Sequence, residues 1–335
     1  MLLLAFSAYS FASEPSAAPA DSSTDDFADW HADELMDWCL SALQTGEMSG
    51  VDGAGIAYAA LTDSAHDGTL IISSGRTETW IKYCEVVYDL RDLEMDIWLI
   101  DHRGQGFSER LLADSDKGHV EDFGDYATDL EAFITDVVGV SSSDAVILLG
   151  HSMGGMIAAA VTAARPDLID GLVLSAPMLG LNTDPYPETL SWWIAWGAYW
   201  WGYGEDYALG RGPYEDYSFE DNGVTSSLGR YTAHRDQRDT WPEVRLGGPT
   251  WSWLYESLTV TRSSVALADG LEVPTLLLQA GDDAIVTPER QDLFCSAASD
   301  CMLLEIEGAQ HELLQESDAI RDDVLDEVRT FIHAL

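Results

Sequence analysis

Short apolar runs alternate with amphipathic stretches along most of the chain. The apolar runs are typical of buried strands, and the stretches between them have helical spacing. The pattern predicts strands at 56–61, 69–74, 95–100, 145–149, 171–175, 274–279 and 302–306. It predicts helices at 79–93, 122–138 and 320–334, and a further helix that starts at Thr287-Pro288. Such alternation indicates an α/β fold, with a mostly parallel central sheet and helices on both faces.

The alternation stops between residues 178 and 255, and this segment is rich in aromatic side chains. It holds eight of the twelve tryptophans: Trp192, Trp193, Trp196, Trp200, Trp201, Trp241, Trp251 and Trp253. The α/β pattern resumes after it. We therefore expect an insertion at 178–255 within a core formed by residues 31–177 and 256–335.

Residues 1–30 are expected to lie outside this core. The first twelve residues are apolar and end in small residues that suit signal cleavage, although they contain no basic n-region. Residues 13–29 are rich in Ala, Ser, Pro and Asp and predict a flexible linker. An exported or periplasmic protein, or a peripheral membrane protein, is the favoured interpretation, and a cytoplasmic location stays open. No run reaches the roughly 18–20 apolar residues of a spanning helix.

The charge balance narrows the possible partners. The formal net charge is −43, from 59 acidic and 16 basic residues, and only Lys82 and Lys117 are lysines. Such a chain repels polyanions, so nucleic acid is not an expected partner. The acidic residues are scattered along the chain, which indicates adaptation to high salt, where the Debye length falls to about 3 Å at 1 M. An ordinary acidic bacterial enzyme is the alternative.

The cysteines predict neither a metal site nor a cofactor site. Cys39, Cys84, Cys295 and Cys301 contain no C-x-x-C pair, and no nearby histidine completes a zinc site. Cys295 and Cys301 are close enough in sequence to form a disulfide in an oxidising compartment. Two buried thiols are the alternative.

The stretch at 150–154 is Gly-His-Ser-Met-Gly, a G-x-S-x-G match between a strand and an Ala-rich helix. Small residues on both sides of the serine permit a sharp turn, which exposes the hydroxyl at the end of the strand. This context predicts Ser152 as a nucleophile and the Met153 N–H as an oxyanion donor. A glycine-rich turn that only packs closely is the alternative.

Two later turns provide an acid and a base. Asp283 follows the penultimate strand, and His311 follows the last one. Loops at the carboxyl ends of parallel strands share one edge of the sheet, so both should approach Ser152. The order serine, acid, histidine is that of the α/β-hydrolase triad. Asp283 is preferred to Asp282 because it lies past the turn, facing the histidine.

A second oxyanion donor should come from the loop after the second strand, where the Arg76 N–H is the candidate. His102 and His119 precede the serine, which breaks the chain order of a triad. His151, inside the turn, is expected to be a packing residue.

The sequence resembles the bacterial lysophospholipase and monoacylglycerol-lipase-like branch of the α/β-hydrolases, and most of all the membrane-associated lysophospholipases of Gram-negative bacteria. The motifs that carry the resemblance are Ser74-Gly75-Arg76, Lys82-Tyr83, 101–106 (DHRGQG), 150–155 (GHSMGG), 176–178 (APM), 247–250 (GGPT), 276–279 (LLLQ) and His311-Glu312. The resemblance implies hydrolysis of a single acyl ester of a lipid without a cofactor, with Ser152, Asp283 and His311 as the triad. Many relatives have His-Gly where this sequence has Ser74-Gly75. This difference changes the hydrogen bonding of the loop on which the Arg76 assignment depends.

The resemblance also implies that the insertion is a cap over the site. Trp192, Trp196 and Trp200 are candidate substrate-binding residues, in an acyl tunnel or in contact with a bilayer, unless they only pack the cap onto the core. Basic groups at His234, Arg235 and Arg238 could meet a phosphate or form internal salt bridges.

Three alternative functions stay open. A general carboxylesterase has the same triad. A proline-aminopeptidase-type amide hydrolase needs carboxylates for a free amino group, for which Glu205, Asp206 and Glu215 are candidates. A binding protein that has kept the fold without activity is the third. The oligomeric state is not predicted.

Overall fold

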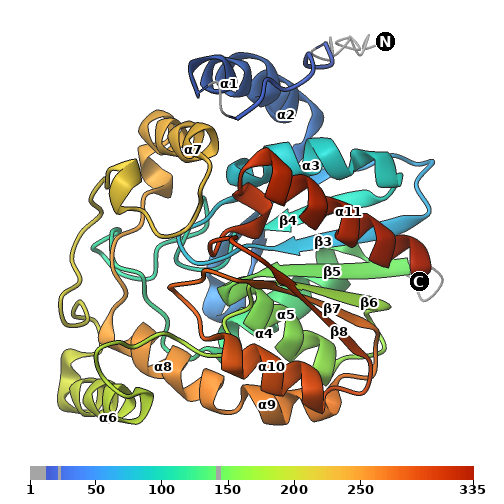
Figure 1. Ribbon diagram of the computed structural model, residues 1–335. Helices are drawn as coiled ribbons and strands as arrows, with labels where there is room; N and C mark the ends of the chain where they lie inside the picture. Colours follow the sequence, from blue (N-terminus) through green and yellow to red (C-terminus); the bar gives the residue numbers. More distant parts are fainter. Residues whose placement is uncertain (1–12, 22–23, 141–144) are drawn as a thin grey trace, which may run out of the picture.

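An eight-stranded sheet forms the centre of the computed structural model, which describes residues 13–21, 24–140 and 145–335 (Figure 1). The strand order is β1-β2-β4-β3-β5-β6-β7-β8. β1 pairs with β2 and β2 with β4 in antiparallel fashion, and the pairs from β4 to β8 are parallel. The strands are β1 (Gln44–Ser49), β2 (Gly55–Leu61), β3 (Gly68–Ser73), β4 (Asp96–Ile100), β5 (Ala145–His151), β6 (Gly171–Ser175), β7 (Thr275–Ala280) and β8 (Cys301–Ile306). The predicted mostly parallel sheet is confirmed.

The inner parallel strands β5, β6 and β7 carry long apolar runs because both faces of the sheet are buried there, whereas the edge strand β8 is partly exposed. In β3, Leu70 and Ile72 belong to one hydrophobic cluster and Ile71 to the other. The first face is covered by α3 (Cys84–Leu90) and α11 (Asp318–Ala334). The helices of the opposite face are α4 (Gly124–Ala132), α5 (Met153–Ala164), α9 (Ser264–Leu267) and α10 (Pro288–Ala297), as Figure 1 shows. α10 begins at the predicted proline, although the Thr287 side chain makes no capping hydrogen bond.

The predicted flexible linker at 13–29 is wrong from residue 24 onward. Helices α1 (Thr24–Trp30) and α2 (Met36–Ala42), joined by a π-helical turn, precede the sheet, and α1 contacts α7 (Leu228–Thr240) of the insertion. Phe27 and Trp30 are buried, and Trp30 Nε1 donates to the Ser16 carbonyl at 2.9 Å. Two large rings are enough to anchor a short helix whose composition is otherwise polar. The apolar leader at 1–12 lies outside the described residues.

All four cysteines are disulfide-bonded, in two pairs. Cys295 in α10 bonds to Cys301 in β8, which decides between the two alternatives for that pair. Cys39 in α2 bonds to Cys84 in α3, a pairing across 45 positions that the spacing did not predict. This second bond ties the N-terminal helices to the core.

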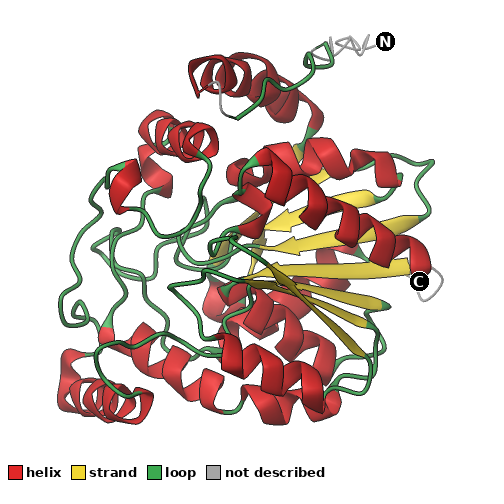
Figure 2. Ribbon diagram, viewed as in Figure 1, coloured by secondary structure: helices red, strands yellow, loops and turns green. Residues whose placement is uncertain are grey.

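The insertion lies at the carboxyl ends of the parallel strands, on the left of the view in Figure 2. It contains α6 (Glu188–Ala198) with the π-helical turn Tyr199–Tyr203, α7 (Leu228–Thr240) and α8 (Trp251–Arg262). α8 crosses the predicted boundary at 255/256, and its Trp253 is part of the core beneath it. α8 therefore belongs to cap and core at once. No helix in the described part of the chain is long and apolar enough to cross a membrane.

Candidate active site

A strained turn between β5 and α5 carries Ser152. Its φ of 52° and ψ of −117° lie in a region that residues other than glycine rarely adopt. Glycines at 150 and 154 permit this turn. A Cβ on Gly150 would lie 2.6 Å from the Gly154 carbonyl oxygen, and one on Gly154 would collide with the Ser73 carbonyl of the neighbouring strand. The sequence thus holds the serine hydroxyl at the end of the central strand, as G-x-S-x-G predicts.

Three predicted residues from three loops are in hydrogen-bond contact. Ser152 Oγ lies 2.8 Å from His311 Nε2, and His311 Nδ1 lies 2.7 Å from Asp283 Oδ2. The other oxygen of Asp283 accepts from the N–H groups of Ile285 and Val286. With a proton on Nδ1 donated to the carboxylate, Nε2 is free to accept the serine proton.

Asp283, and not Asp282, reaches the histidine. Asp282 is exposed, and only its backbone is tied down, through an N–H···O bond to Ala309. Burial alone would raise the pKa of Asp283, but the hydrogen bond and charge of His311 and the two backbone N–H groups lower it below its ordinary value. The carboxylate therefore stays ionised and can stabilise an imidazolium.

Two backbone N–H groups are candidates to bind an oxyanion. Met153 opens α5, and the first N–H groups of a helix have no intrahelical partner. On the loop after β3, Gly75 N–H donates to Glu78 Oε2 at 2.5 Å and is occupied. Among the described residues, the next N–H, that of Arg76, has no acceptor. The Arg76 assignment therefore stays a prediction that the loop geometry permits.

The remaining histidines named above have structural partners. His102 is fully buried against Ser73 Oγ at 2.8 Å, and burial lowers its pKa to about 3. His119 Nδ1 lies 3.0 Å from Thr250 Oγ1. His151 donates to the Ser175 carbonyl. Within the described ranges, no three metal-ligating side chains come together.

A buried charge cluster beside the triad was missed by the sequence reasoning. Lys82 Nζ lies 2.7 Å from Glu78 Oε1 and 2.6 Å from Glu312 Oε1, and Tyr83 OH donates to Glu78 at 2.6 Å. Although burial opposes ionisation, Lys82, His151 and the hydrogen bonds lower the pKa of Glu78 to about 2. Since Glu312 follows His311, this cluster links the oxyanion loop to the histidine loop. The sequence feature that could have indicated this cluster is Lys82 itself, because the chain has only two lysines.

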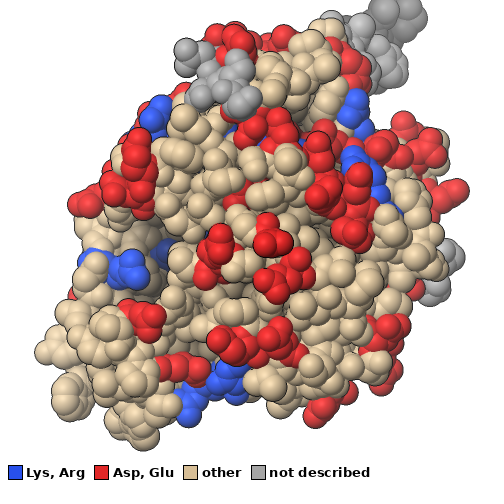
Figure 3. All heavy atoms as spheres, viewed as in Figure 1, with Lys and Arg blue, Asp and Glu red and all other residues tan. Residues whose placement is uncertain are grey.

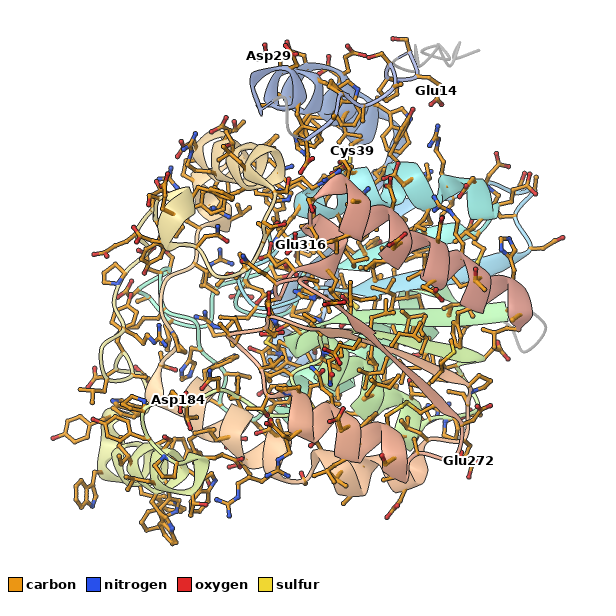
Figure 4. All side chains as sticks on the ribbon, in the orientation of Figure 1. Glu14, Asp29, Cys39, Asp184, Glu272 and Glu316 are labelled. Carbon is orange, nitrogen blue, oxygen red and sulfur yellow. A yellow bond between two sulfur atoms is a disulfide. The ribbon has the colours of Figure 1, made fainter. Side chains whose placement is uncertain are left out.

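The three candidate tryptophans of α6 differ in their surroundings. Trp192 is half-buried and donates from Nε1 to Thr259 Oγ1 of α8 at 2.9 Å. Trp196 is 37% exposed and Trp200 66%. Figure 4 shows the side chains of this segment projecting from the edge of the molecule, below the labelled Asp184. Exposure of this kind differs from that expected of rings in an enclosed acyl tunnel.

The three basic candidates of the cap have internal partners. His234 is buried between Gln237 and Gln315, and burial lowers its pKa to about 3. Arg235 pairs with Asp236, and Arg238 donates to Tyr214 OH. The internal salt bridge left open above is found for Arg235, while His234 and Arg238 have uncharged partners.

Known proteins are similar in sequence to this protein over most of its length. A family model described as "Serine aminopeptidase, S33" (Hydrolase_4) matches residues 64–318. Lysophospholipase L2 of Escherichia coli K12 is 35% identical over 294 residues, which cover 86% of each chain. Mouse monoglyceride lipase is 27% identical over 267 residues, covering 78% of this chain and 81% of its own.

Solved structures show the same fold at lower identity. A carboxyl esterase from Bacillus coagulans in complex with glycerol superposes with a TM-score of 0.72 at 16% identity, covering 88% of this chain and 98% of its own. A soluble variant of monoglyceride lipase from Saccharomyces cerevisiae gives 0.67 at 18% identity, covering 87% and 94%. The fold is therefore the α/β-hydrolase fold that the sequence predicted.

Proposed function

The chain belongs to the Hydrolase_4 family of serine hydrolases and is a carboxylic ester hydrolase, and from this premise we propose that it cleaves the acyl ester of lysophospholipids or monoacylglycerols. One observation carries the proposal. The hydrogen-bonded residues Ser152, His311 and Asp283 belong to a protein that is 35% identical to a lysophospholipase over 86% of its length.

The proposed chemistry proceeds through an acyl-enzyme. Ser152 Oγ attacks the ester carbonyl while His311 Nε2 takes its proton. The tetrahedral oxyanion then accepts hydrogen bonds from the backbone N–H groups of Met153 and Arg76. The glycerol-side oxygen leaves with the proton held by His311. Water then attacks the acyl-enzyme by the same route and releases the fatty acid. Asp283 holds the imidazole in the required tautomer.

An ester substrate is favoured over a peptide amine. An aminopeptidase needs a polar pocket for a free amino terminus. The cap carboxylates considered for that role, Glu205, Asp206 and Glu215, are all exposed. A general carboxylesterase would differ from the proposed lipid hydrolase in preferring esters with short acyl chains.

The aromatic face of the cap supports contact with a lipid surface. Residues 190–203 contain no charged side chain. Trp193, Trp200, Trp201 and Tyr203 are each more than half exposed. Indole and phenol rings are stable where apolar chains meet water. The net charge of −43 disfavours anionic headgroups, so a neutral or zwitterionic surface is the proposed partner.

Export is the proposed route to that surface. The two disulfides suit an oxidising compartment, and residues 1–12 have the composition of a short leader. Mass determination of the N-terminus of the natural protein tests the proposal. An intact Met1 in protein isolated from the cytoplasm would contradict it.

The function is tested by fatty-acid release from lysophosphatidylethanolamine, monoacylglycerol, a short-chain aryl ester and an aminoacyl arylamide, in low and in multimolar salt. Long-chain lipid esters should be preferred, and Ser152→Ala should abolish turnover without a loss of stability. A preference for the short aryl ester would leave a general carboxylesterase. Cleavage of the arylamide alone would favour the aminopeptidase.

A further inference from the structure

The few cations of this chain are mostly neutralised by its many carboxylates. Ten of the sixteen lysines and arginines form an ion pair with Asp or Glu. In the described part of the chain the other six form none: Arg76, Arg110, Lys117, Arg211, Arg238 and Arg262. With 59 acidic residues available, cations that stay unpaired and lie close together require a reason.

Three of these cations come from separate segments that meet beside the oxyanion loop. Arg76 belongs to that loop, Lys117 to the segment after β4, and Arg211 to the cap. Arg76 Nη2 donates to the Gly247 carbonyl at 2.7 Å, and a Cβ on Gly118, next to Lys117, would collide with the same nitrogen. A Cβ on Gly248 would lie 2.5 Å from Arg211 Cβ.

Backbone hydrogen bonds hold the three segments together. Gly118 N–H donates to the Gly248 carbonyl at 3.1 Å, and Gly248 N–H donates to the Gly212 carbonyl at 2.8 Å. Lys117 and Arg211 adjoin this ladder, so the fold fixes their backbone positions, and the Lys117 Nζ lies 5.4 Å from the centre of the Tyr207 ring. Figure 3 shows Lys and Arg atoms in a hollow on the left of the view, where Figure 1 places the cap loops, while acidic atoms are spread over the rest of this face.

The Arg76 guanidinium is only partly satisfied by the protein. It lies 5.0 Å from the centre of the Trp253 ring, and its Nε is buried with no hydrogen-bond partner among the described residues. Burial, and more weakly the charge of Arg211, lower its pKa to about 10 against the opposite effect of Tyr126. No salt bridge joins this guanidinium to a carboxylate in the described chain, and Asp116 of the 114–118 segment accepts from Tyr214 N–H at 3.1 Å. A buried cation next to another cation is unfavourable unless an anion binds there.

We propose that Arg76, Lys117 and Arg211 form a subsite for the phosphodiester of a lysophospholipid. The inference rests on the proposed function and selects between its two lipid classes, because a monoacylglycerol has no anion to place there. Arg76 supplies its backbone N–H to the oxyanion and its side chain to the phosphate. Only the glycerol unit of the substrate separates the ester oxygen from the phosphate, so one residue can serve both. The planar fork of arginine matches two phosphate oxygens.

The test compares lysophosphatidylethanolamine with a monoacylglycerol of the same acyl chain, at one salt concentration. Arg211→Gln removes an exposed charge at little risk to folding. It should lower kcat/KM on the lysophospholipid by roughly tenfold or more, the value of a charge-assisted hydrogen bond, and lower it much less on the monoacylglycerol. Arg76→Lys, which keeps the charge and loses the fork, should shift the ratio in the same direction. Arg235→Gln, an exposed cap arginine paired with Asp236, is the matched control and should leave the ratio unchanged.

The outcomes separate the inference from the proposed function. Equal losses on both lipids in Arg211→Gln, or a shift of the ratio in Arg235→Gln as large as that in Arg211→Gln, would overturn the subsite while hydrolysis stands. No release from either lipid by wild-type protein that a serine phosphonate still labels would overturn the proposed function itself. sn-Glycero-3-phosphoethanolamine should inhibit the wild type competitively, and inhibit Arg211→Gln more weakly. Inhibition by inorganic phosphate alone would indicate a free-phosphate site and refute the headgroup assignment.

Discussion

Replacing Lys82 by methionine should be among the most destabilising single changes in this protein. The lysine bridges Glu78 and Glu312 at 2.7 and 2.6 Å, and the three side chains are 9%, 4% and 15% exposed. Methionine fills similar volume without charge and leaves two buried carboxylates without their shared counter-ion. Breaking one buried ion pair in this way costs about 3–5 kcal/mol. We therefore expect the free energy of unfolding at pH 7 to fall by about 3–5 kcal/mol.

The pH dependence of this loss tests its electrostatic origin. In the wild type the pKa of Glu78 is lowered from 4.5 to about 2, so its contribution to stability is fully present above pH 4.5 and disappears as the pH falls towards 2. In Lys82→Met, burial without the lysine raises the pKa of the carboxyls, which then favour folding when protonated. The difference between wild type and variant should therefore be largest near neutral pH and shrink below about pH 4.5.

Denaturant unfolding followed by tryptophan fluorescence, at several pH values and one salt concentration, measures this difference. Lys117→Met is the matched control, because it removes the only other lysine from a position with no ion pair in the described chain. Its effect should stay within about 0.5 kcal/mol. A loss below about 1 kcal/mol for Lys82→Met, or the same loss at pH 4 and pH 7, would refute the reasoning.

Three further predictions concern catalysis, salt and lipid. Asp283→Asn should lower kcat by about 10⁴-fold because the histidine loses its tautomer control, whereas Asp282→Asn should retain activity; steady-state kinetics on one ester decides, and equal losses would remove the preference for Asp283. The melting temperature should rise from low to multimolar KCl, since self-repulsion among 59 acidic residues is screened; a flat or falling curve in differential scanning calorimetry would contradict salt adaptation. Joint replacement of Trp200 and Trp201, 66% and 82% exposed, by serine should weaken sedimentation with phosphatidylcholine vesicles while activity on a soluble short ester is kept; unchanged sedimentation would argue against this face as the contact.

Local patterns predicted those parts of the fold that local forces determine. The run from Ala145 to the G-x-S-x-G turn is apolar because both sheet faces cover it, and the turn needs glycines where backbones touch, so strand, turn and helix could be read together. The positions of Asp283 and His311 followed from the rule that loops after parallel strands share an edge.

What escaped prediction depends on partners far away in sequence. Lys82 and Glu312 are 230 positions apart, and no periodicity connects them. Helix α1 was hidden by its polar composition because only two of its residues, Phe27 and Trp30, provide the anchor. The Cys39–Cys84 bond likewise joins two helices whose packing against each other no local sequence pattern predicts.

The two halves of the cap are attached to the core by different forces. In α7, Arg230 is buried, binds Glu85 of α3 through two nitrogens at 2.7 and 2.9 Å, and reaches Asp318 of α11 at 2.9 Å. Such a bidentate buried pair fixes position as well as distance.

Among the described residues, helix α6 is tied to the core helix α10 by a half-exposed ion pair, Glu188 with Arg290 at 3.2 Å, and not by a buried bidentate pair. It rests on α8 mainly through ring contacts, such as Tyr199 stacked on Tyr255 at 5.1 Å and Trp192 at 5.8 Å from the same ring. Aromatic contacts of this kind can slide at less cost than a buried ion pair can break. The half of the cap that exposes apolar rings is thus the half that lacks a buried ion pair to the core among the described residues. It leads through α8 to Trp253, whose ring lies under Arg76 at the edge of the oxyanion loop.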